Sequence, residues 1–230
     1  MFILVQTPSI VLDVDVLERN VTRMAARAAA LGVTLRPHVK THKCAEIGKL
    51  QLERGARGIT VATFAEARDF VTAGFTDVTL AFPLDPGKAD LAIDLAREIP
   101  LFRSTVDDRG AAEALAAAAR RAGIRAHVFL KVDCGYHRAG VNPSSPASLG
   151  LARFLSDSPS LAFDGLLSHS GHAYAQSSPE GIRRVAEEER AVMVEFAGTL
   201  RAAGIEVRRL SGNKRRARVI PRRTRRGASK

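Results

Sequence analysis

Tryptophan is absent from the 230-residue sequence, and only two tyrosines and two cysteines are present. Two cysteines, Cys44 and Cys134, are too few for a disulfide framework, which excludes a small disulfide-stabilised secreted domain and favours a reducing compartment. Apolar runs are short, and the N-terminal run MFILVQ has no basic segment before it, so neither a membrane span nor an export signal is predicted. These absences favour a cytoplasmic protein.

Acidic residues are absent from one end of the chain. The formal net charge is +11, yet residues 208–230 contain nine Arg, two Lys and no acid, which leaves 24 basic and 24 acidic residues in the rest. That neutral part is long enough for a large core. The basic end has no aromatic residue and no recognised motif, so specific nucleic-acid binding is not predicted. We expect residues 213–230 to form a disordered tail.

Short apolar or β-branched runs alternate with longer segments of helical period. This alternation is typical of parallel strands joined by crossover helices. Asp85, Asp108 and Ser178 supply helix start signals. Because no G-x-G-x-x-G follows the first strand, the pattern predicts a TIM-type (β/α)8 barrel over residues 1–212, short of its last strand, rather than a nucleotide-binding open sheet. The predicted strands are residues 33–39, 58–63, 77–82, 101–106, 125–132, 162–168 and 205–210, with a further strand at 9–13 before a helix at 16–31.

The stretch RPHVKTHK concentrates positive charge at the end of the first predicted barrel strand. Strand alternation places Arg36, His38 and Lys40 on one face, which in a barrel lines the interior toward the carboxyl-end rim. A lysine desolvated among cations loses its charge more readily than one in water, so Lys40 is a candidate to bond a phosphorylated aldehyde such as pyridoxal phosphate. The alternative is a solvated basic loop. Pro37 cannot donate to a strand ladder and predicts an irregular start.

A second polar segment, KVDCGYHRAG (131–140), follows the strand at 125–132. Lys131, Asp133 and Arg138 carry charges of both signs at the rim where Lys40 is expected. An arginine aimed at a cofactor ring would tune its electronics, with Asp133 or Lys131 holding that arginine in place. An ordinary ion pair at a strand end is the alternative.

A third polar segment, LLSHSGHAY (166–174), follows the strand at 162–168. His169 and His172 are metal-ligand types, but with no cysteine or carboxylate beside them a complete metal site is not supported. We expect one of these histidines to pack beside a planar cofactor or to act as an acid or base, with Tyr174 nearby. A structural histidine is the alternative for each. Three polar segments that follow three barrel strands would meet at one rim, where barrel enzymes place their active sites.

These segments resemble a known family. RPHVKTHK resembles the signature of the pyridoxal-phosphate-dependent D-threonine aldolase and eukaryotic-type D-serine dehydratase family, a branch of the alanine racemase-like, fold-type III enzymes. TPSIVLDVDVLERNV resembles the opening of these proteins, GITVATFAEA and DVTLAFP resemble their second and third strands, and VDCGYHRAGV and GLLSHSGHAY resemble their later active-site loops. The similarity covers about residues 7–212.

The resemblance implies roles for individual residues. Lys40 matches the family's Schiff-base lysine, which also acts as an acid and base in catalysis. Arg138 matches an arginine near the cofactor, and Lys131 matches a lysine close to that arginine. His172 matches a histidine beside the cofactor, and it stands with Lys40 as the candidate catalytic pair. His38, Thr41 and Tyr174 are expected to support the cofactor pocket.

The sequence departs from the family pattern after Gly212. Members of the family continue with a turn resembling SGGSTPT, whose backbone amides bind the cofactor phosphate, then an eighth strand and a β-rich domain. That domain carries the ligands of a divalent metal and completes the active site across a homodimer, so we expect the metal ligands to be absent here. We interpret the Arg-rich end as translation in another reading frame or a truncated product, with a genuine basic extension as the alternative.

The predicted function is a pyridoxal-phosphate-dependent lyase that acts on D-β-hydroxy amino acids, by aldol cleavage or by dehydration. A chain without the eighth strand and the metal domain is expected to have weak activity or none. The alternative is a non-enzymatic pyridoxal-phosphate-binding protein, whose single-barrel length fits but whose lysine context differs from RPHVKTHK.

Overall fold

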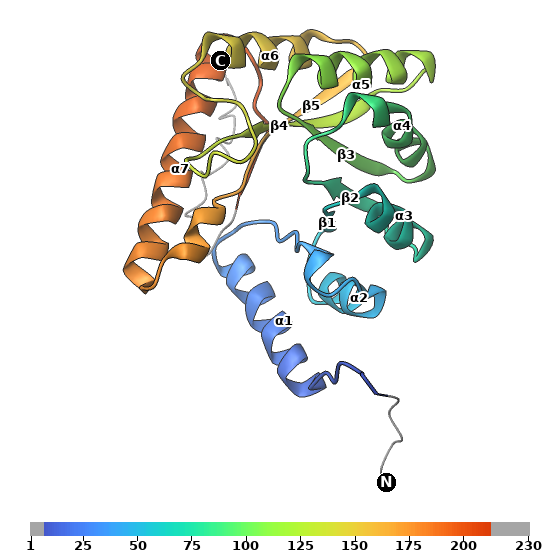
Figure 1. Cartoon of the computed structure of the whole chain (residues 1–230), viewed down its shortest axis with the longest axis vertical. Coiled ribbons are helices and arrows are strands. Elements are labelled where there is room, and N and C mark those ends of the chain that lie inside the picture. The colour runs from blue at the N-terminus through green and yellow to red at the C-terminus, as the bar shows by residue number, and fades with distance from the viewer. Residues whose placement is uncertain (1–6, 213–230) are drawn as a thin grey trace, which may run out of the picture.

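The computed structural model describes residues 7–212, and in them one parallel sheet curls into part of a barrel (Figure 1). Neighbouring strands in space are also neighbours in sequence, as in a (β/α) barrel. The predicted incomplete barrel is therefore confirmed. Its strands are β1 (Ile59–Val61), β2 (Asp77–Leu80), β3 (Leu101–Val106), β4 (Ala126–Val132), β5 (Leu161–Ser168) and β6 (Arg209–Ser211). The predicted tail at 213–230 lies outside the described residues.

The helices cover the convex side of the sheet (Figure 1). They are α1 (Val14–Ala30), α2 (Ala45–Glu53), α3 (Phe64–Thr72), α4 (Ala89–Glu98), α5 (Arg109–Arg121), α6 (Pro146–Asp157) and α7 (Pro179–Ala202). Short 3₁₀ turns are η1 (Val39–Thr41), η2 (Pro86–Lys88) and η3 (Gly171–Ala175). Two predicted start signals are confirmed, since Asp108 caps α5 and Ser178 caps α7 through their side chains. Asp85 caps η2 rather than α4. No helix in the part of the chain described here is long and apolar enough to cross a membrane.

Three predicted strands differ from the structure. Residues 33–39 lie beside β1 and pair with it through a single bridge, His38 to Thr60. They are not a regular strand because Pro37 has no N–H to donate. Residues 9–13 are exposed and belong to no strand. The predicted strand at 205–210 is shorter and begins only at Arg209, because Ile205 instead closes the end of α7 by donating to Leu200.

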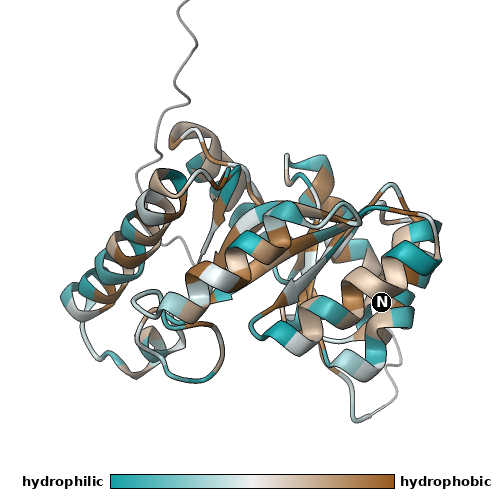
Figure 2. Cartoon of the chain, turned by 90° about the horizontal axis from the view of Figure 1, so that it is seen from above, coloured by the Kyte–Doolittle hydropathy of each residue, from teal (hydrophilic) through white to brown (hydrophobic). Residues whose placement is uncertain are grey.

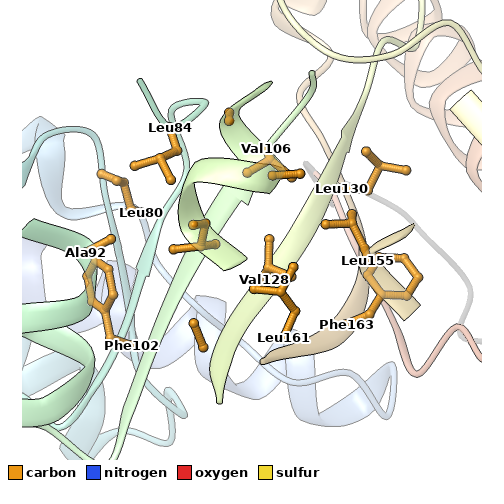
Figure 3. Packing of buried hydrophobic residues seen from close by; sticks show 14 of the residues in the cluster. Leu80, Leu84, Ala92, Phe102, Val106, Val128, Leu130, Leu155, Leu161 and Phe163 are labelled. Carbon is orange, nitrogen blue, oxygen red and sulfur yellow. The ribbon is translucent and has the colours of Figure 1, made fainter. Parts of the chain in front are cut away.

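The core lies between the sheet and the helices. Alternate strand residues point outward onto the helices, including Phe102, Val128 and Leu161, which pack with Leu155 of α6 and Ala92 of α4 (Figure 3). The strands are mostly hydrophobic, and the helices carry one apolar and one polar side (Figure 2). Burial of this outer face holds the half-barrel together.

The inward face of the strands is charged at its amino-terminal end. Five side chains alternate in sign across the interior, and we name this row the charge ladder. The bonded atoms are Arg36 Nη2 to Asp77 Oδ2 at 2.7 Å, Arg103 Nη1 to Asp77 Oδ1 at 2.6 Å, Arg103 Nε to Asp164 Oδ2 at 2.7 Å, and Arg209 Nη1 to Asp164 Oδ1 at 2.7 Å. Burial alone would raise the pKa of Asp77, but the bonds and charges of Arg36 and Arg103 outweigh it and lower that pKa. The ladder therefore stays ionised at neutral pH.

Candidate active site

The ring of His38 lies where the three polar segments meet. His38 caps η1 by accepting the backbone N–H of Lys40 at Nδ1, 3.4 Å away. The pKa of His38 is lowered to about 4, mainly by burial and also by the charges of Lys40, His169 and Lys131, while Glu66 opposes the shift. Residues from all three segments are therefore within electrostatic range of one neutral imidazole at the carboxyl-end rim.

Lys40 is not the desolvated lysine of this site. It lies in η1, so strand alternation stops before it, and its side chain is exposed. The buried lysine is Lys131 at the end of β4, which is only 4% exposed and donates from Nζ to the carbonyl of Ala81 at 3.4 Å. The pKa of Lys131 is lowered to about 8, mainly by burial and also by the nearby charge of Arg138. The desolvation argument made for Lys40 therefore applies to Lys131.

Aromatic rings form a wall beside these cations. The rings of Tyr136 and His172 stack with centroids 6.0 Å apart, and the ring of His169 meets Tyr136 edge-on at 6.1 Å. Tyr174, which is 80% exposed, lies tilted against His169 at 6.2 Å. The guanidinium of Arg138 lies 5.2 Å from the centre of the Tyr136 ring. The structure thus brings His172 and Arg138 together through Tyr136, a residue that the motif reading did not single out.

Asp133 does not hold Arg138 in place, which was one of the two expectations from the sequence. Its carboxylate accepts the backbone N–H groups of Gly135 and His137 and bonds the ring of His137 at 2.8 Å. These bonds fold the loop after β4 rather than hold Arg138. The loop then returns to the strand end at Gly140, whose positive φ and close approach to the backbone of Val132 leave no room for a side chain.

Two buried carboxylates support the rim from behind. Glu66 accepts the backbone N–H of Ala62 at 2.7 Å and pairs with Lys43 at 3.3 Å. The pattern Thr63-x-x-Glu66 is a capping box and could have revealed this glutamate from the sequence, since Thr63 caps α3.

The second carboxylate, Glu189 of α7, is 4% exposed. It accepts the hydroxyls of Ser168 and Ser170 at 2.6 and 2.8 Å, one on each side of His169. Burial raises the pKa of the neighbouring Cys134 thiol to about 12, and the charge of Glu189 contributes to the rise. Sequence reasoning missed Glu189, although its place among Val185, Met193 and Phe196 on the apolar side of α7 could have revealed it.

Metal-binding side chains do not cluster here. Among residues 7–212, no group of three or more His, Cys, Asp or Glu residues is arranged to hold a metal ion.

Residues 12–214 match the sequence model of a family described as "Alanine racemase, N-terminal domain". The chain belongs to this family. It is 40% identical over 200 residues to the D-threo-3-hydroxyaspartate dehydratase of Delftia sp. (strain HT23), an alignment that covers 86% of this chain and 52% of the relative. The crystallised Delftia protein superimposes with a TM-score of 0.86 at 38% identity, over 91% of this chain and 55% of the other.

Two further relatives have different named activities. The D-serine dehydratase of Dictyostelium discoideum is 34% identical over 87% of this chain and 54% of the relative. The D-threonine aldolase of Arthrobacter sp. is 34% identical over 90% of this chain and 55% of the relative. The chain thus spans about half the length of the curated relatives it matches.

The alanine racemase-type barrel of this chain has a rim that fits a phosphorylated aldehyde cofactor. Lys40, Lys131 and Arg138 are cationic, while the carboxylates behind them are occupied by Lys43, by His137 and by two serine hydroxyls. Lys40 and Arg138 are exposed, and cationic side chains of this kind can bond a phosphate directly. In addition, Nδ1 of the His172 ring is buried and, within residues 7–212, has no hydrogen-bond partner. A planar, polar ligand beside Tyr136 would satisfy it.

Proposed function

We propose that this site binds pyridoxal phosphate and belongs to a lyase that acts on D-β-hydroxy amino acids, by dehydration or by aldol cleavage. The observation that supports it most is the convergence of Lys40, Lys131 and His169 on the ring of His38 at the carboxyl-end rim of the parallel sheet. The named activities of the relatives support the substrate class. The free thiols of Cys44 and Cys134 support a reducing compartment such as the cytoplasm.

Each residue at the rim would have its own role in binding the cofactor or in moving a proton. The exposed amine of Lys40 would hold the cofactor's aldehyde and, when released, take the proton from the α-carbon of the substrate. When bound, the cofactor supplies an electron-withdrawing ring that stabilises negative charge at that carbon. Arg138 and the ring of His172 would contact the cofactor, and Tyr174 would close the open side. His38, neutral at physiological pH, would keep the Lys40 turn in place without adding charge.

The first test asks whether Lys40 carries the cofactor. Purified protein is incubated with pyridoxal phosphate, reduced with borohydride and digested, and the modified lysine is identified by mass spectrometry. Lys40 should carry the label, and Lys40→Ala should abolish it. Lys49→Ala, which removes an exposed lysine of α2, should leave it unchanged. Labelling that persists in Lys40→Ala contradicts the assignment.

The second test separates an enzyme from a cofactor carrier. The loaded protein is given D-threonine, D-serine and D-threo-3-hydroxyaspartate, with the L-amino acids as controls. Glycine and an aldehyde indicate aldol cleavage, whereas a 2-oxo acid and ammonia indicate dehydration. A protein labelled at Lys40 that forms no product from any of them is a binding protein, which remains the second candidate because the chain spans about half of its relatives' length.

A further inference from the structure

Glu189 lies on the side of α7 that packs against the sheet, among side chains that are otherwise apolar. Val185 stands one turn before it and Met193 one turn after it, and all three side chains are buried. A carboxylate in such a position is costly unless hydrogen bonds compensate for the lost water. An apolar side chain of similar size would avoid this cost, so packing alone does not account for a glutamate here.

The compensating hydrogen bonds come from two serines on either side of one histidine. Ser168, the last residue of β5, donates to Oε1 of Glu189 at 2.6 Å, and Ser170 donates to Oε2 at 2.8 Å. Both serines are buried. Each oxygen of the carboxylate thus holds one hydroxyl. We name Ser168, Ser170 and Glu189 the serine clamp.

The serine clamp determines the direction of His169. Alternate side chains at the end of a strand point to opposite sides. Since Ser168 and Ser170 both reach a carboxylate on α7, the side chain of His169 between them points away from that helix, toward the rim. The ring contacts agree with this direction, because His169 meets Tyr136 edge-on with centroids 6.1 Å apart and lies tilted against Tyr174 at 6.2 Å.

We propose that Glu189 is a positioning residue of the active site, which turns the ring of His169 toward the cofactor by holding the two serine hydroxyls. The inference rests on the proposed function, since it concerns the ring wall beside which a planar cofactor would lie. A single serine hydroxyl rotates freely, but two hydroxyls bound to one carboxylate fix the backbone of three consecutive residues. His169 therefore meets the cofactor in a direction that is already set, which reduces the entropy lost on binding.

A role through charge is the alternative, because Glu189 is within electrostatic range of Lys131 and Cys134. Two conservative variants separate the two roles. Glu189→Gln keeps the length of the side chain and still accepts from one serine and donates to the other, but it has no charge. Glu189→Asp keeps the charge but is one methylene shorter, so it cannot reach both hydroxyls. Positioning requires Glu189→Gln to resemble the wild type more closely than Glu189→Asp does.

A third variant separates positioning from stability. It replaces the whole serine clamp by apolar residues, with Ser168→Ala, Ser170→Ala and Glu189→Met together. Because donors and acceptor are removed at once, such a replacement is close to neutral for stability. This apolar variant should unfold at nearly the same urea concentration as the wild type, yet lose the direction of His169. If it does not fold, as judged by circular dichroism, the comparison of Glu189→Gln with Glu189→Asp decides the question alone.

The direction of His169 is measured first, in the full chain without cofactor. Tyr136 and Tyr174 are the two tyrosines of the chain, so their ring protons are easily assigned by nuclear magnetic resonance. In the wild type both rings should show nuclear Overhauser effects to the ring of His169. We expect these effects to persist in Glu189→Gln and in the control Glu188→Gln, which removes an exposed carboxylate one residue away. They should be lost in Glu189→Asp and in the apolar variant.

Cofactor binding is measured next, by titration with pyridoxal phosphate followed through tyrosine fluorescence. The variants that lose the direction of His169 should bind the cofactor about three- to tenfold more weakly, as expected for the loss of one aromatic ring contact. Glu189→Gln should retain most of the affinity, and Glu188→Gln should retain all of it.

Three results would overturn the proposal. Ring effects that persist in the apolar variant would show that the serine clamp only fills space. A larger loss in Glu189→Gln than in Glu189→Asp would show that Glu189 acts through its charge. Loss of the ring effects without a loss of affinity would remove His169 from the pocket. A wild type that does not bind pyridoxal phosphate contradicts the proposed function instead, and the ring effects in the unbound protein still decide whether Glu189 orients His169.

Discussion

Replacement of Lys131 by methionine should make the protein more stable. The pKa of Lys131 is lowered from 10.5 to about 8, mainly by burial. Because a tenfold change in proton affinity corresponds to about 1.4 kcal/mol, keeping this lysine charged at pH 7 costs the folded state about 3 kcal/mol. Methionine has a similar length and no charge, and among residues 7–212 the substitution removes one hydrogen bond of Lys131, the bond to the carbonyl of Ala81 at 3.4 Å. Lys131→Met should therefore raise the free energy of unfolding at pH 7 by up to about 3 kcal/mol.

The pH dependence gives the sign of the effect. Between pH 8 and 10.5 the lysine still binds a proton in the unfolded wild type but has lost it in the folded wild type. The free energy of unfolding of the wild type therefore increases as pH rises through this window. Below pH 8 the penalty is fully present. Urea titrations at several pH values should show a difference between variant and wild type that is largest at pH 7 and vanishes near pH 10.5.

The control for this prediction is Lys88→Met, which removes an exposed lysine of η2. Its unfolding should follow the wild-type pH dependence. The reasoning is refuted if Lys131→Met is less stable than the wild type at pH 7, or if its difference from the wild type does not change with pH.

Two further predictions concern buried groups near the rim. Glu189→Ala should lower the free energy of unfolding by about 2–4 kcal/mol, because it leaves two buried serine hydroxyls without their acceptor; Glu188→Ala, on the exposed side of α7, should cost less than about 0.5 kcal/mol in the same urea titrations. A thiol reagent at pH 8 should modify Cys44 in the folded protein and Cys134 only after denaturation, because the Cys134 thiol is 6% exposed and its pKa is raised to about 12. Similar labelling rates for the two thiols would contradict the burial of Cys134.

The order of strands and helices could be predicted because it depends on local patterns. The alternation of short apolar runs with capped helical segments is enough to predict parallel strands, and Asp108 and Ser178 cap the helices as expected. The prediction of a strand at 33–39 was wrong, but the irregularity that Pro37 predicted there is confirmed, since one bridge joins this segment to β1. Residues 9–13 have a strand-like composition, but an apolar run forms a strand only where a partner strand is available to it.

The positions of the site's side chains were harder to predict because they depend on how deeply each residue is buried and on hydrogen bonds that cap short turns. His38 accepts the N–H of Lys40 and turns the chain into η1, which exposes Lys40, and alternation alone contains no information on such a turn. Lys40 and Lys131 both lie at the ends of strand-like segments. Packing of the whole barrel determines that Lys131 is the buried one of the two. Glu189 has two charged neighbours, so its role becomes visible only from the helical phase that aligns it with Val185 and Met193.

The charge ladder also bears on how the strands find their register. A slip of β3 by one residue would turn Arg103 outward toward the helices and Phe102 inward. The guanidinium of Arg103 would then lie among the apolar side chains that face the helices, away from Asp77 and Asp164. An uncompensated buried charge costs about 3–5 kcal/mol. The interior charges and the outer hydrophobic layer therefore favour the same register of β3, in which Arg103 faces Asp77 and Asp164 while Phe102 packs in the core.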